Sequence, residues 1–200
     1  MRVVIINGAY RVHGLTDLIL QEMRLELTRR QIPYDYFVLQ DLDIRYCYNC
    51  RGCMQSEQGS VGHCHQQDDM QAIIAAIEHS DAFILASPTN MGTVTAVYKC
   101  FMERLSVYGF WPFGQSAPKY RHAGVLQKRA ILLHSSAAPA WMAYWAFNTH
   151  KVLAKSAYLL GAKVVGRFSI GLQSKPLPIT LSQAHIAQAQ RWVERLVNTK

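Results

Sequence analysis

The sequence predicts an α/β fold in which helices cover both faces of a doubly wound parallel sheet of five strands. Short apolar strand segments alternate with helical segments along the chain, the strand segments are apolar almost without interruption, and 50% of all residues are hydrophobic. Strands of this kind are buried on both sides, and parallel neighbours need crossover connections that wrap helices around the sheet. A chain of 200 residues is expected to form one domain over residues 1–200.

Five strands and five helices are expected to alternate. The strands are predicted at 2–7, 34–39, 82–86, 130–134 and 163–170, and the helices at 15–30, 68–77, 95–107, 140–160 and 182–197. Two insertions stand out, a cysteine-rich one at 41–67 and an aromatic one at 108–127. Ligands of a doubly wound sheet bind beyond the carboxyl ends of the strands, where the strand order switches. The segments 8–16, 87–93 and 134–140 are therefore candidates for a binding site.

Composition and charge argue against several classes of protein. No apolar stretch approaches the roughly 20 residues that cross a bilayer. The apolar run after Met1 is too short for a secretory signal, so a cytoplasmic location is expected. The net charge of +8 comes from scattered Lys and Arg residues without a dense stripe or a nucleic-acid motif. A solvated surface that favours phosphorylated ligands is therefore preferred to nucleic-acid binding.

The first candidate loop, Gly8–Thr16, leads directly into the first predicted helix. Free backbone N–H groups and the positive end of that helix would face the loop. Gly14 permits close backbone approach, Thr16 offers a hydroxyl and Arg11 offers a charged donor, so the pattern indicates phosphate binding. An ordinary turn, with Gly14 for its backbone freedom and Thr16 as N-cap, explains the same residues.

The second candidate loop reads Ser87-Pro88-Thr89-Asn90-Met91-Gly92-Thr93. Pro88 stiffens the exit from the strand, and the backbone amides of residues 89–92 are able to donate hydrogen bonds to a planar polar ring. A plain turn explains the proline and the glycine equally well.

Together these loops resemble the NADPH-dependent FMN reductase and iron–sulfur flavoprotein group of the flavodoxin-like superfamily. That group has a Gly-Ser-Pro-Arg type loop followed by Gly-Asn-Thr. The matching residues here are Gly8, Arg11, Gly14 and Thr16, whereas Ala9, Tyr10 and Leu15 replace the Ser, Pro and Asn. The family's second loop resembles Ser87–Gly92, and the Lys and acid–Arg pair of its next helix correspond to Lys99, Glu103 and Arg104. The third loop corresponds to His134–Ala137, where small residues let the backbone approach the ring edge.

The resemblance covers residues 2–137 and implies a flavodoxin-like sheet of strand order 2-1-3-4-5 that holds FMN without a covalent bond. The residues expected to bind FMN are Gly8, Tyr10, Arg11, Gly14, Leu15, Thr16, Ser87, Pro88, Thr89, Asn90, Met91, Gly92, His134, Ser135 and Ser136. The flavin is expected to carry the chemistry, so no side chain is nominated as catalytic.

The implied reaction passes two electrons from NAD(P)H to a small acceptor such as a quinone, a nitroaromatic or free flavin. Related folds commonly complete the flavin site between subunits, so a homodimer or homotetramer is expected. Two alternatives stay open. One is an electron-transfer protein that carries flavin, alone or with an iron–sulfur cluster, and the other is a binding module of the same fold without a cofactor.

Four of the five cysteines gather in the first insertion. Cys47, Cys50 and Cys53 are spaced three residues apart and Cys64 follows, which resembles the family's cysteine segment. Four thiolates in this arrangement can hold a [4Fe–4S] cluster, with one sulfur for each iron. A zinc site that includes His63 or His65, and unligated thiols in a loop that covers the flavin or contacts a subunit, are the alternatives. The aromatic insertion is expected to cover the ring, receive an aromatic substrate or be buried between subunits.

Overall fold

The computed structural model describes residues 1–57, 61–122, 126–172 and 179–198. Its main sheet consists of five parallel strands, β1 (Val3–Asn7), β2 (Tyr34–Val38), β3 (Ala82–Pro88), β6 (Lys128–Ser135) and β7 (Ala162–Ile170). Their spatial order is β2-β1-β3-β6-β7. The α/β class and the parallel sheet are confirmed. The last two strand labels differ from the predicted order because an unpredicted antiparallel ribbon, β4 (Gly109–Phe110) with β5 (Lys119–Tyr120), lies between β3 and β6 in the chain.

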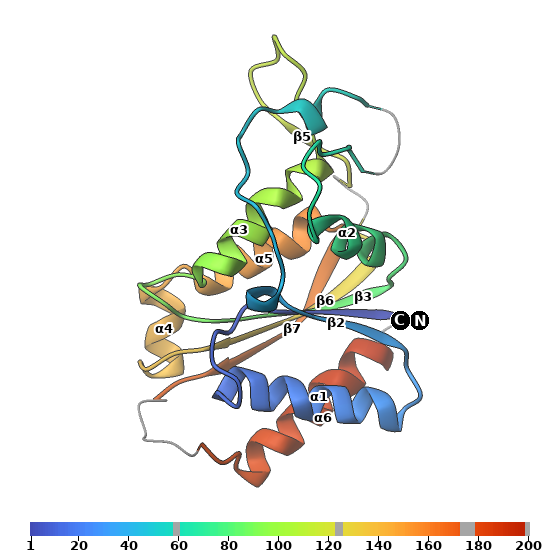
Figure 1. The fold of residues 1–200 in the computed structure, drawn as a ribbon. Helices are drawn as coiled ribbons and strands as arrows, with labels where there is room; N and C mark the ends of the chain where they lie inside the picture. Colours follow the sequence, from blue (N-terminus) through green and yellow to red (C-terminus); the bar gives the residue numbers. More distant parts are fainter. Residues whose placement is uncertain (58–60, 123–125, 173–178, 199–200) are drawn as a thin grey trace.

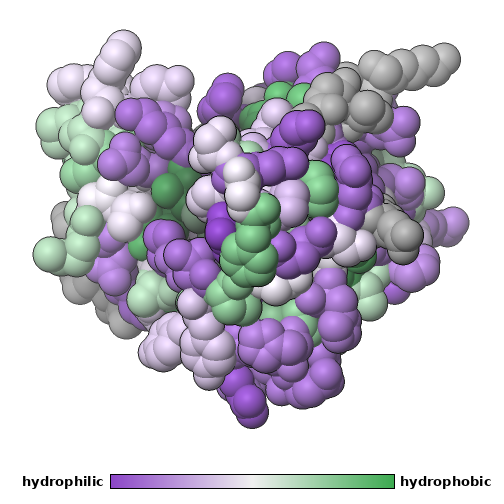
Figure 2. Space-filling view, turned by 90° about the horizontal axis from the view of Figure 1, so that it is seen from above, coloured by the Kyte–Doolittle hydropathy of each residue, from purple (hydrophilic) through white to green (hydrophobic). Residues whose placement is uncertain are grey.

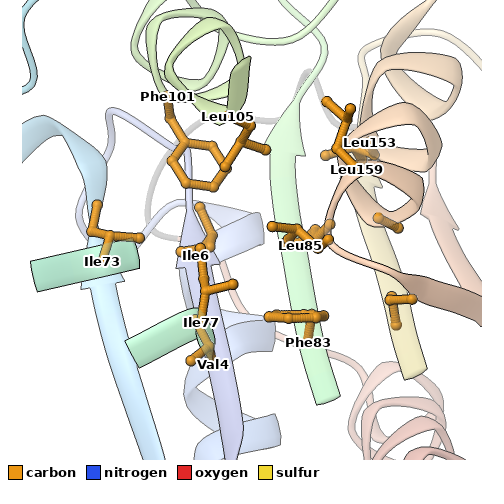
Figure 3. Packing of buried hydrophobic residues seen from close by; sticks show 14 of the residues in the cluster. Val4, Ile6, Ile73, Ile77, Phe83, Leu85, Phe101, Leu105, Leu153 and Leu159 are labelled. Carbon is orange, nitrogen blue, oxygen red and sulfur yellow. The ribbon is translucent and has the colours of Figure 1, made fainter. Parts of the chain in front are cut away.

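Helices cover both faces of this sheet. Figure 1 shows α1 (Leu15–Arg29) and α6 (Gln183–Asn198) below it, and α2 (Met70–Glu78), α3 (Ala96–Arg104) and α5 (Thr149–Leu159) above it. Side chains of a strand alternate between the faces, so each strand contributes to two cores. On β1, Val4 and Ile6 belong to the core beneath α2, α3 and α5, whereas Val3 and Ile5 belong to the core against α1 and α6. Figure 3 shows the first of these cores, with Phe101 lying over Ile6.

The prediction of one helix over 140–160 is wrong. The segment forms two helices, α4 (Ala140–Ala146) and α5, because the backbone becomes extended at Phe147, with φ −119° and ψ 154°. The N–H of Asn148 then donates to the Gly92 carbonyl at 2.8 Å. This contact with a distant loop ends α4 and attaches it to the edge of the sheet where the candidate loops lie.

The two insertions pack on each other beyond the sheet, at the top of Figure 1. The first insertion contains a 3₁₀ turn, Gly52–Met54. Two further 3₁₀ turns, Leu39–Asp41 and Leu105–Tyr108, lead into the first and the second insertion. The N–H of Trp111 donates to the Met54 carbonyl at 2.8 Å, and that of Gly62 to the Val107 carbonyl at 2.7 Å. Figure 2 shows that hydrophilic residues cover most of this side, with separate hydrophobic patches. Within the described residues, no helix has the length and apolar character needed to cross a membrane.

Candidate functional site

The three predicted loops converge on one cavity at the carboxyl ends of β1, β3 and β6. Its volume is about 330 Å³. Ten of the predicted FMN-binding residues line it: Tyr10, Arg11, Gly14, Leu15, Thr16, Pro88, Thr89, Asn90, Ser135 and Ser136. The lining also includes Ala9, Thr95, Ala137 and Ile179, which the prediction did not select. Thr95 was recognisable from the sequence as a helix N-cap, but nothing local indicated that it faces a ligand cavity.

The first loop leaves donors available at the start of α1. Gly14 occupies the N-cap and provides no side-chain cap, and the N–H of Gly14 itself donates to the Arg11 carbonyl at 3.1 Å. The N–H groups of Leu15 and Thr16 belong to the first turn of the helix and have no intrahelical acceptor, and both residues line the cavity. A Cβ on Gly14 would lie 3.1 Å from both the Cβ and the carbonyl oxygen of Arg11, so the turn is tight. This arrangement fits a phosphate group.

The second loop is a turn in which some backbone N–H groups already donate hydrogen bonds within the protein. The N–H of Asn90 donates to the Thr93 carbonyl at 2.8 Å, and Met91 and Gly92 have φ values of 48° and 80°. The N–H of Thr89 donates to the Ser135 carbonyl at 2.7 Å. The expectation that all amides of residues 89–92 are free for a ring is therefore wrong for Thr89 and Asn90. Of these four, only the N–H groups of Met91 and Gly92 make no hydrogen bond within the described residues.

The third loop connects to the other two. The hydroxyls of Ser135 and Thr16 lie 2.9 Å apart, which joins the end of β6 to the first turn of α1. Ser136 is held by its N–H, which donates to the Ile170 carbonyl at 2.9 Å, and by its hydroxyl, which donates to the Ala138 carbonyl at 2.9 Å. Both serines are buried, and these hydrogen bonds hold them at the cavity wall.

Five predicted site residues lie outside the cavity lining: Gly8, Ser87, Met91, Gly92 and His134. Ser87 is fully buried, and its hydroxyl accepts from the Thr95 N–H at 3.1 Å. Gly8 packs against Tyr98, and Met91 is 96% exposed. These residues shape the loops without reaching the cavity.

His134 lies on the opposite face of the sheet from the cavity. Its ring is 6.4 Å from that of His150, between centroids, and Tyr144 stacks on His150 at 4.2 Å. Burial, and secondarily the neighbouring His150, lowers the pKa of His134 to about 4. His134 is therefore a neutral core residue at pH 7. Side chains alternate between the faces of a strand, so His134 points away from the face that Ser135 occupies.

The four clustered cysteines line a second cavity between the two insertions, with a volume of about 210 Å³. The Ser106 hydroxyl lies 3.6 Å from the Cys53 sulfur and 3.9 Å from the Cys47 sulfur. Burial raises the pKa of Cys53, and the other three cysteines add to the effect. Cys100 is only half-buried and lines a different cavity. Four thiols around one space match the number and kind of ligands that a [4Fe–4S] cluster needs, one sulfur for each iron.

The described side chains around this cavity do not form an assembled metal site. Among the residues that the structure describes, no three Cys, His, Asp or Glu side chains are grouped closely enough to hold one metal. His65 lines the cysteine cavity, whereas His63 lies on another one. The geometry of the described residues therefore shows neither the zinc site nor the cluster, and the five cysteines are free thiols in this structure.

Arg104 connects the cysteine cavity to the core. Its guanidinium donates twice to Asp68, at 2.5 and 3.1 Å, and once to the Cys64 sulfur at 3.6 Å. The side chains of Arg104 and Asp68 are 2% and 0% exposed. This buried pair holds the end of the cysteine segment against α3.

Comparison with known proteins places the chain in a flavoenzyme family. The model of the NADPH-dependent FMN reductase family matches residues 1–175. The chain belongs to this family, and the resemblance inferred from the loops is confirmed.

Individual relatives are more distant. An iron–sulfur flavoprotein of Archaeoglobus fulgidus is 34% identical over 112 residues, which is 56% of this chain and 49% of that protein. The chain thus spans about half the length of the curated relatives it matches. An NAD(P)H:quinone oxidoreductase from Methanothermobacter marburgensis has a TM-score of 0.68 at 15% identity, covering 100% of this chain and 96% of that one. An FMN-dependent NADH-azoreductase from Bacillus anthracis, in complex with FMN, has a TM-score of 0.69 at 12% identity, covering 99% and 100%. These solved structures share the fold.

Proposed function

We propose that this chain binds FMN noncovalently in the cavity of the three loops and catalyses two-electron transfer from a reduced nicotinamide to a small acceptor. The observation that supports this proposal is the convergence of the loops on one preformed cavity, in a chain that belongs to an FMN reductase family. FMN bound there would supply the redox chemistry, taking a hydride from the nicotinamide and returning two electrons to a quinone, a nitroaromatic or free flavin.

The residues divide into two groups in this proposal. The N–H groups of Leu15 and Thr16 and the side chain of Arg11 hold the phosphate, because they combine a helix N-terminus with a charged donor. Pro88, Asn90 and Ser136 line the remainder of the cavity and position the ring. No acidic or basic side chain is needed for the hydride step.

The absorbance spectrum of anaerobically purified protein, recorded after FMN addition and gel filtration, tests this binding. Retained flavin should give bands near roughly 375 and 450 nm and should be bleached by NADPH or NADH. Removing the Arg11 donor in Arg11→Gln should weaken FMN binding about 10- to 100-fold, since a charge-assisted hydrogen bond is lost. Arg191→Gln, an exposed arginine on α6, serves as the control. Protein absorbance alone after FMN addition would overturn the proposal and favour a cofactor-free module.

A second candidate function is electron transfer through a cluster in the cysteine cavity. It is supported by the four thiols that line one space and by the names of the iron–sulfur flavoprotein relatives. Iron and acid-labile sulfide should then be present near four atoms each per chain. Cys53→Ser should lose both, whereas Cys100→Ser should keep them. Iron-free protein after anaerobic reconstitution would reject the cluster, and fast turnover with a small acceptor would favour the enzyme over the carrier.

A further inference from the structure

A further cavity lies on the other side of the first loop, and the proposed FMN site does not use it. Its volume is about 310 Å³, and it lies at the carboxyl ends of β1 and β2 beside α1. It shares Ala9, Tyr10 and Arg11 with the FMN cavity. A molecule that occupies both cavities would therefore pass over a single loop.

Arg24 of α1 supplies this cavity with an unsatisfied cationic group. Its guanidinium carbon stands 4.2 Å from the centroid of the Tyr36 ring, so stacking holds the group in place. Its Nε is buried without a hydrogen-bond partner among the described residues. Arg24 and Arg11 also form no salt bridge within the part of the chain that the structure describes. A planar guanidinium with free donors is the group that recognises phosphate oxygens.

Two carboxylates also line the cavity. Asp17 is already compensated, because it accepts hydrogen bonds from the His13 N–H at 2.9 Å and the Tyr36 hydroxyl at 3.1 Å. Asp41 follows β2, is exposed and also lines the cavity. In dinucleotide-binding sheets, a carboxylate accepts the ribose 2′-hydroxyl of NAD, or a nearby arginine accommodates the 2′-phosphate of NADP. Arg24 is thus the group of this cavity that suits a 2′-phosphate, and the Asp41 carboxylate takes no part in recognising it.

We infer that this cavity binds the 2′-phosphoadenosine end of NADPH, and that Arg24 is the residue that selects NADPH over NADH. The inference rests on the proposed function, because the nicotinamide end must reach the FMN cavity. Tyr10 and Arg11 form the wall between the two ends of the dinucleotide. NADH lacks the 2′-phosphate and so gains nothing from Arg24.

Steady-state kinetics of FMN-loaded Arg24→Gln test this selection. KM for NADPH should rise about 10- to 100-fold, the range for a lost charge-assisted contact, while KM for NADH and the FMN content stay within twofold. Arg24→Lys, which keeps the charge without the fork, should give an intermediate value. Arg191→Gln should change neither KM. Equal changes in both KM values would overturn the role of Arg24.

Ligand binding tests the cavity without any turnover. Adenosine 2′,5′-bisphosphate should bind the full chain, with or without FMN, at least 10-fold more tightly than adenosine 5′-monophosphate by isothermal titration calorimetry. Arg24→Gln should abolish that difference. Equal affinities in a chain that retains FMN would refute this cavity but leave the proposed function intact. A preference for the bisphosphate in a chain that retains no FMN would support the cavity and reject the proposed function.

Discussion

The buried ion pair between Asp68 and Arg104 is the contact whose removal should destabilise the fold most. The Asp68 carboxylate accepts from the guanidinium and from the N–H groups of Arg45 and Met70, at 3.0 and 3.2 Å. The guanidinium also donates to the Arg45 carbonyl at 2.9 Å. Asp68→Ala would leave the guanidinium buried without its counter-charge, which typically costs about 3–5 kcal/mol. At about 2–4 °C per kcal/mol for a chain of this size, Tm should fall by about 6–20 °C.

Urea unfolding followed by circular dichroism measures this cost. Glu103→Ala breaks the exposed i,i+4 pair with Lys99 on the same helix and is the matched control, with an expected loss of less than about 1 kcal/mol. The double variant Asp68→Ala/Arg104→Met should lose less than the single variant, because no charge remains buried. If Asp68→Ala costs no more than Glu103→Ala, the buried-pair reasoning is wrong.

The same pair predicts a pH dependence. Burial raises the pKa of Asp68, but the Arg104 guanidinium and the backbone N–H groups outweigh it, so the pKa lies below its ordinary value. The folded-state pKa is then below the unfolded value of about 3.9. The pair therefore stabilises the fold above about pH 4, and its contribution is lost as pH falls through the folded pKa. Wild type should lose stability more steeply than Asp68→Asn over that range.

Three further predictions concern other parts of the molecule. The pKa of His134, about 4 in the fold, favours the neutral ring, so the free energy of unfolding should fall by roughly 3 kcal/mol as pH drops from about 6.5 to 4. His134→Leu should flatten this dependence of the unfolding free energy on pH, measured by urea unfolding. Gly8→Ala should lower the free energy of unfolding by about 1–3 kcal/mol, because its Cβ would lie 2.9 Å from the Cβ of Tyr98. Gly52→Ala, whose Cβ would meet only a sulfur at 3.7 Å, should leave the free energy of unfolding nearly unchanged in the same urea experiment. Trp145, 82% exposed on α4, is expected at a contact between copies of the chain, so Trp145→Ser should lower the mass seen by light scattering while changing the unfolding free energy by less than about 0.5 kcal/mol.

The sequence predicted the sheet well because its strands carry the signal in their own residues. Residues 82–86 and 130–133 are apolar throughout, and both segments lie within observed strands. The break between α4 and α5 had no such signal. It depends on the hydrogen bond from Asn148 to Gly92, a partner far away in the chain, and the apolar pattern of 140–160 continues across it. The ribbon β4–β5 was missed for a related reason, since two-residue strands are too short to show alternation.

The candidate site was predictable as a set of loops but not residue by residue. Ser135 and His134 are neighbours in β6, so their side chains must point to opposite faces, and only one of them can reach a cavity beside α1. That rule was available from the sequence and would have excluded His134. The hydrogen bond from the Thr89 N–H to the Ser135 carbonyl could not be predicted from the sequence, because it joins two different loops.

Helix α3 relates the two candidate redox sites to each other. Its N-cap, Thr95, lines the FMN cavity and donates to the Gly8 carbonyl at 2.6 Å, and its last residue, Arg104, lines the cysteine cavity. The helix has 9 residues, so at roughly 1.5 Å of rise per residue its ends are about 13 Å apart. Buried contacts hold both ends of α3 in place. The distance between the FMN cavity and the cysteine cavity is therefore set by the length of this helix. The two proposed functions, enzyme and electron carrier, therefore use the same fold. They differ in what occupies the cysteine cavity and in how fast a small acceptor reaches the flavin.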